Sequence, residues 1–175
     1  MLGRHRNGRA VARLVRICPL VFSIPDERLS SAVMSKENLR NLRVLLVEGN
    51  PDDVFLFQKV AQVQYPNWHV DALGSVVQAK EWLSPSSIQP IPDLLITALL
   101  LPLESGCDLI AWVRLQPRFQ RLFVLVLSDS MDLADRKRAL ALGANLFIEK
   151  SADLSSVLAT ISRAVEGSEP QLPAL

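Results

Sequence analysis

The sequence is poor in cysteine and has no long apolar run, and each shortage excludes a class of protein. Its two cysteines, Cys18 and Cys107, stand far apart, with no CxxC pattern or Cys/His group beside either. This usage excludes a zinc module and a disulfide framework, and it favours a reducing, cytoplasmic compartment. No segment approaches the roughly 20 consecutive apolar residues of a membrane-spanning helix. We therefore expect no membrane span.

Neither sign of charge dominates the chain, which has 19 basic and 18 acidic residues and a formal net charge of +1. Such a balance gives no global field to attract nucleic acid or an anionic membrane. Apolar residues make up 49% of the 175 residues, which is enough to bury the core of one domain. We therefore expect one globular domain and no specific nucleic-acid partner.

Residues 1–41 have a different composition, with five arginines and no acid in the first 25 positions. One interpretation is a secretory signal, but Arg13 and Arg16 interrupt its apolar part. A second is a basic arm that contacts phosphates or lipid headgroups. A third is that the start is misassigned and that the protein begins at Met34, so that the basic, disordered leader over 1–41 is mostly not part of it. We favour the third interpretation.

Five predicted strands alternate with five predicted helices from residue 43 onward. Residues 43–47 form a β-rich apolar run, and Asn50 and Pro51 then supply an N-cap and a first-turn proline for a helix over 51–64. The later strand and helix pairs are predicted at 68–73 and 75–83, 93–97 and 107–115, 122–127 and 132–142, and 145–148 and 153–165.

Uninterrupted apolar strands separated by helices predict a parallel sheet that is covered on both faces. Five such units fit a flavodoxin-like, doubly wound α/β fold with three layers, as one domain over 42–167 followed by a tail over 168–175. The working site of this architecture lies at the carboxyl ends of the strands, where the strand order reverses. The loops of interest therefore begin near Glu48, Ala98, Ser128 and Glu149.

The first of these loops opens with VEGNPDD at 47–53, and the segments PDLLI at 92–96 and LLLP at 99–102 flank the second. These motifs resemble the receiver domains of two-component response regulators, and the match extends over about 42–166. In that family the first loop has two adjacent acids, and the phosphoacceptor aspartate stands four residues before the proline. Here Ala98 stands at the acceptor position.

Other spacings keep the same frame. Gly106, Ser128 and Lys150 stand where the family has a glycine, a hydroxyl residue and a lysine, and the GAN sequence at 143–145 resembles the segment before that lysine. Moving the frame to place Thr97 at the acceptor position would break the match to the proline and the glycine. Several motifs in register are far more specific than any one of them.

The resemblance implies that phosphotransfer has been lost. Aspartyl phosphorylation needs a carboxylate nucleophile, and it needs Mg²⁺ held by hard oxygen ligands. Of the three acids that the family uses, this sequence keeps Glu48, while Gly49 and Ala98 replace the others; Leu100 stands where the family supplies a backbone carbonyl. The resemblance therefore implies a pseudo-receiver with no catalytic residue and no cofactor, in which Mg²⁺ binding is lost or weak.

The polar residues that remain have ordinary roles in this interpretation. We expect Lys150 and Glu48 to pair, because burying an unpaired ammonium costs several kcal/mol of folding free energy. Asp52 and Asp53 are interpreted as solvated first-turn acids that complement a helix dipole. The Ser128 hydroxyl is expected to bond to nearby backbone.

The sequence leaves two alternative hypotheses for the function, from different classes. The leading one is a phosphorylation-independent interaction module in a two-component or phosphorelay pathway, whose partner is a histidine kinase or another signalling protein; Phe147 and Phe55 are its candidate interface residues. The alternative is a phosphoacceptor regulator that uses Thr97, Ser105 or Glu104, the last of which is otherwise expected to be a solvated loop residue. A nucleotide-binding enzyme is disfavoured, because no glycine-rich phosphate loop follows the first strand.

Overall fold

The computed structural model describes residues 41–85, 89–130, 132–150 and 153–165. The expectations for the leader before residue 41 and for the tail over 168–175 lie outside these residues. Within the part that is described, no helix is both long enough and apolar enough to cross a membrane.

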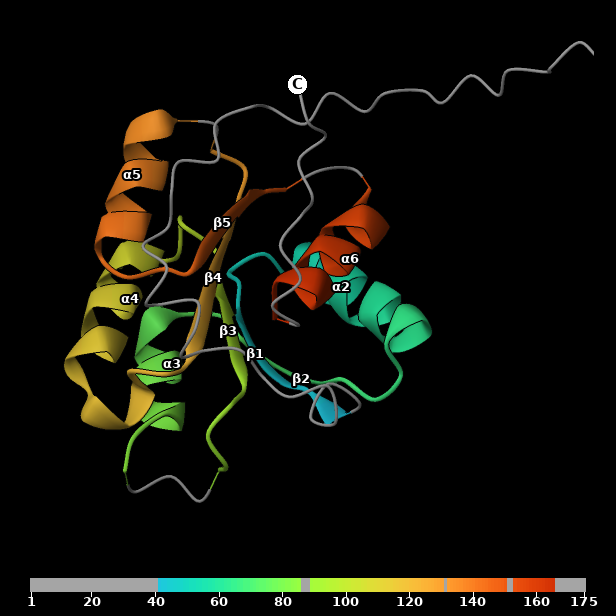
Figure 1. The fold of residues 1–175 in the computed structure, drawn as a ribbon, viewed down its shortest axis with the longest axis horizontal. Helices are drawn as coiled ribbons and strands as arrows, with labels where there is room; N and C mark the ends of the chain where they lie inside the picture. Colours follow the sequence, from blue (N-terminus) through green and yellow to red (C-terminus); the bar gives the residue numbers. More distant parts are fainter. Residues whose placement is uncertain (1–40, 86–88, 131, 151–152, 166–175) are drawn as a thin grey trace, which may run out of the picture.

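Five strands form one parallel sheet in the order β2-β1-β3-β4-β5, and helices cover both faces (Figure 1). The strands are β1 (Arg43–Val47), β2 (His69–Leu73), β3 (Leu94–Thr97), β4 (Phe123–Ser128) and β5 (Leu146–Glu149). The helices are α2 (Pro51–Gln64), α3 (Val76–Trp82), α4 (Gly106–Leu115), α5 (Leu133–Ala141) and α6 (Leu154–Val165), and a short 3-10 helix, η2 (Pro117–Phe119), follows α4. This is the predicted flavodoxin-like fold, and each predicted element ends within one residue of its predicted bounds.

The sheet separates two apolar cores. Helices α2 and α6 pack on one face, and α3, α4 and α5 pack on the other (Figure 1). In β1, Val44 and Leu46 belong to the core beneath α2 and α6, whereas Leu45 and Val47 belong to the opposite core. Successive strand side chains point to opposite faces, so a strand that is covered on both sides must be apolar throughout.

Side-chain caps start several helices at the carboxyl edge of the sheet. The Asn50 side chain accepts a hydrogen bond from the Asp52 amide, and Pro51 stands in the first turn of α2. Ser105 and Asp108 form a reciprocal capping box at the start of α4, and Asp132 caps α5. Because the caps hold the first helical turns, they also fix the loops that leave the strands.

Arg114 near the end of α4 fixes the approach to β5. Its guanidinium donates to the Gly143 carbonyl at 2.9 Å and to Asn145 Oδ1 at 2.8 Å, and it also reaches the carbonyls of Phe119 and Leu122 at 3.0 Å. Gly143 has a φ of +109°, and a Cβ there would lie 2.9 Å from Arg114 Cγ. The GAN segment therefore needs its glycine for both conformation and space.

Candidate functional site

The four residues expected around the site come together at the carboxyl edge of the sheet. Glu48 follows β1, Ala98 follows β3, Ser128 ends β4 and Lys150 follows β5. The Ala98 amide donates to the Val47 carbonyl at 2.9 Å, and the Lys150 amide donates to the Ser128 carbonyl at 2.8 Å. The strand order reverses between β1 and β3, so these residues surround the switch point of the fold.

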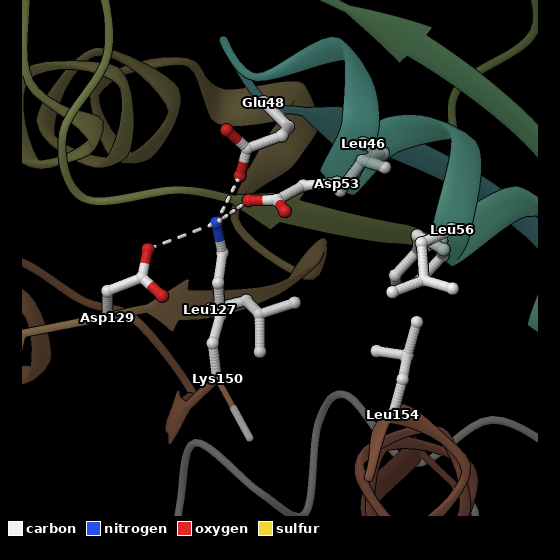
Figure 2. A pocket seen from close by; sticks show the side chains of 9 residues that line it. Leu46, Glu48, Asp53, Leu56, Leu127, Asp129, Lys150 and Leu154 are labelled. Atoms are coloured by element: carbon white, nitrogen blue, oxygen red, sulfur yellow. Dashed lines mark hydrogen bonds and ion pairs between the residues drawn. The ribbon is translucent and has the colours of Figure 1, made fainter. Parts of the chain in front are cut away.

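The ammonium of Lys150 lies at the centre of a cluster of carboxylates (Figure 2). Its Nζ is 2.8 Å from Glu48 Oε2, 2.7 Å from Asp53 Oδ2 and 3.3 Å from Asp129 Oδ2. Glu48 is held from the other side, because its Oε1 accepts the Asn50 amide at 2.9 Å. Three carboxylates thus share one cation in a partly buried place.

The cluster determines the proton affinity of Lys150. Burial alone would lower the pKa of its ammonium, but the hydrogen bonds and charges of Asp53 and Glu48 outweigh burial and raise the pKa above the usual 10.5. Lys150 therefore stays charged at any physiological pH. The cation is a fixed part of the site.

Two parts of this cluster differ from the expectations. The pairing of Lys150 with Glu48 is confirmed. The interpretation of Asp53 as a solvated helix acid is wrong, because its carboxylate turns back to the ammonium, whereas Asp52 is exposed. Asp129 was missed; its signal was its position directly after Ser128, at the carboxyl end of an apolar strand.

A hollow beside the charged cluster includes Ala98 in its lining, and we call it the hollow above Ala98. It has a volume of about 380 Å³, and Ala98, Pro102, Ser128 and Asp129 are among the residues that line it. A Cβ added at Gly49 would lie 2.9 Å from Pro102 Cδ, so the proline ring fills the space that a side chain at position 49 would need. The loop between β3 and α4 therefore leaves room only for a glycine at position 49.

The three candidates for an alternative acceptor are occupied. Thr97 is fully buried, and its hydroxyl donates to the Ala98 carbonyl at 3.0 Å. The Ser105 hydroxyl donates to Asp108 in the α4 cap. Glu104 is not the solvated residue that was expected, since it forms a 2.7 Å ion pair with Lys80.

Comparison with known proteins identifies the family. Residues 44–162, more than half of the chain, match the family described as the response regulator receiver domain. The chain belongs to this receiver-domain family. The match includes Glu48, Ala98, Ser128 and Lys150, so the resemblance to the family is confirmed.

Individual proteins resemble the chain in sequence over part of its length or in fold. A phosphate regulon transcriptional regulatory protein, PhoB of Rhizobium meliloti (strain 1021), is 29% identical over 82 residues, which are 47% of this chain and 36% of that protein. The chain therefore spans well under two thirds of that relative. Among solved structures, the phosphorylated cyanobacterial phytochrome response regulator RcpA is 27% identical with a TM-score of 0.64, covering 77% of this chain and 99% of RcpA. The Mn²⁺-bound response regulator Rcp1 is 24% identical with a TM-score of 0.61, covering 76% and 99%.

The remaining receiver positions have local partners. The Ser128 hydroxyl accepts the Ser130 amide at 3.0 Å, so it bonds to nearby backbone as expected. Phe147 is buried in the core beneath α3, α4 and α5, so its ring offers no surface to a partner in this conformation. Phe55 is exposed on α2, and the Lys59 ammonium lies 5.6 Å from its ring centroid.

Proposed function

We propose that this receiver domain is a pseudo-receiver, a cytoplasmic, non-enzymatic module that binds a protein partner without being phosphorylated. The partner would be a histidine kinase or another protein of a two-component or phosphorelay pathway. The observation that carries the proposal is the make-up of the site. An alanine, Ala98, follows β3, and three carboxylates hold the ammonium of Lys150.

The first argument is chemical. A phosphoryl group is captured by a nucleophilic oxygen, and the methyl group of Ala98 has none. The nearest hydroxyl on the same strand end, that of Thr97, is buried and donates to a backbone carbonyl. Thr97 could present its hydroxyl to a phosphoryl donor only if the backbone at the end of β3 rearranged.

The second argument concerns the metal that phosphoryl transfer requires. Mg²⁺ needs several oxygen ligands in near-octahedral geometry. Here Lys150 Nζ already occupies the place between Glu48, Asp53 and Asp129, and Gly49 and Ala98 add no side-chain oxygen. Among the residues that the structure describes, no group of acids, histidines or cysteines is arranged to hold a metal. These residues do not fit the ion, so we expect Mg²⁺ binding to be lost or weak.

The test is phosphorylation of the full chain by acetyl phosphate with Mg²⁺, followed by intact-mass measurement. We expect no added phosphoryl mass, whereas a receiver that has the acceptor aspartate gains one in the same mixture. A phosphorylated chain would refute the proposal and favour the alternative function. The variants Thr97→Val, Ser105→Ala and Glu104→Gln would then locate the acceptor.

A further inference from the structure

The loop between β3 and α4 presents two leucines to solvent. Leu100 is 80% exposed and Leu103 is fully exposed, and Leu100 also lines the hollow that includes Ala98. A single exposed leucine is ordinary on a protein surface. Two on the eight-residue loop over 98–105, one of them lining a hollow, form an apolar surface suited to a protein contact.

Four contacts hold this loop in place. Leu100 and Ser105 form an antiparallel bridge, and the Gly106 amide donates to the Leu99 carbonyl at 2.8 Å. Lys80 of α3 pairs with Glu104, and Pro102 packs over Gly49. The backbone that carries the leucines is thus held before any partner arrives, so binding orders little more than the leucine side chains.

The backbone at Leu103 supports the same conclusion. Its φ is 70°, in the left-handed region that a leucine adopts at a cost. The strained conformation turns the side chain fully into solvent, where it gains no burial within this chain. Burial of that side chain against a partner would offset the strain.

The net charge of the neighbouring cluster indicates what kind of partner this surface would bind. Glu48, Asp53 and Asp129 carry three negative charges around the single positive charge of Lys150. Asp129 is exposed and lines the hollow, so the excess negative charge faces outward. An incoming cation is attracted by this excess and an incoming carboxylate is repelled.

We propose that this surface binds a protein segment in which apolar side chains accompany an arginine or lysine. The apolar side chains pack on Leu100 and Leu103, and the basic side chain enters the hollow above Ala98 and pairs with Asp129. The inference rests on the proposed function, because it places a partner's cation where a working receiver holds a metal and a phosphoryl group.

The test is selection of a displayed peptide library on the full chain, followed by affinity measurement for the enriched peptides. We expect enrichment of peptides that combine apolar residues with arginine or lysine. Leu100→Ser and Leu103→Ser should each weaken binding at least tenfold, and Asp129→Arg should weaken it at least as much. Leu115→Ser is the matched control, because Leu115 is 78% exposed at the far end of α4 and its loss should leave the affinity unchanged.

Several results would overturn the proposal: no enrichment, enrichment of acidic peptides, or equal losses for Leu103→Ser and Leu115→Ser. The substituted positions are exposed, so the variants should keep the fold, and circular dichroism checks this. The acetyl phosphate experiment separates the two proposals. A chain that is phosphorylated refutes the proposed function, whereas an unphosphorylated chain whose selected peptides ignore Leu100 and Leu103 refutes the docking surface alone.

Discussion

Lys150 Nζ lies 2.7 Å from Asp53 Oδ2, although 97 residues separate the two in the sequence. The contact joins the residue after the last strand to the first turn of α2. It gives the ammonium a second close carboxylate besides that of Glu48, 2.8 Å away. Glu48, Asp53 and Lys150 are therefore tied together by their own charges.

Removal of the Lys150 ammonium should destabilise the fold more than removal of the Lys80 ammonium, which is more exposed. The Lys150 and Glu48 side chains are 18% and 8% exposed, whereas Lys80 and Glu104 are 30% and 31% exposed. We expect Lys150→Met to lower the free energy of unfolding by about 3 kcal/mol, because it strands partly buried carboxylates. Lys80→Met should cost at most about 1 kcal/mol, because this pair is more exposed to solvent and solvent weakens ion pairs. Urea denaturation of both variants measures this, and equal losses would contradict it.

The fold could be predicted from sequence because local signals and the apolar pattern agree. Asn50 and Pro51 mark the start of α2, and the uninterrupted runs of β1 and β4 require a sheet covered on both faces. The short helix η2 was not predicted. Its three residues carry too little pattern to separate a 3-10 turn from a loop.

The sequence predicts which residues lie at the strand ends and therefore near the site. It does not predict in which direction a side chain on a helix or loop turns. Glu48 and Lys150 follow strands, so the topology alone brings them together. Asp53 stands in a helix, where an acid is usually solvated, and its ion pair with Lys150 depends on the direction that both side chains take. The pairing of Glu104 with Lys80 likewise depends on how a loop folds against α3.

Gly49 and Pro102 should behave as a coupled pair. A Cβ at position 49 would lie 2.9 Å from the proline Cδ, so Gly49→Ala should cost about 1 kcal/mol by overpacking. Pro102→Ala removes the ring, and the double variant should recover most of that loss. Chemical denaturation of the three variants gives the coupling free energy. Additive effects would show that the ring moves aside without cost.

Gly106 should tolerate no side chain. A Cβ there would lie 2.1 Å from the Ala98 carbonyl oxygen, which is backbone and cannot move without shifting β3. We expect Gly106→Ala to lower the free energy of unfolding by about 3 kcal/mol. Gly74→Ala is the control, because the nearest atom to its new Cβ is the side-chain Oε1 of Gln78 at 3.6 Å. Thermal denaturation compares the two, and similar melting temperatures would contradict the prediction.

The ammonium cluster should also set how stability changes at alkaline pH. The pKa of Lys150 is raised in the folded state above its usual 10.5, so its contribution to stability is fully present below about that pH. As the pH rises further, the unfolded chain loses this proton first, and the contribution declines until the folded pKa is passed. The free energy of unfolding of the wild type should therefore fall more steeply above about pH 10.5 than that of Lys150→Met. Other lysines and Tyr65 are the same in both proteins, so the difference between the two curves isolates Lys150. Parallel curves would mean that the carboxylates do not hold the ammonium in solution.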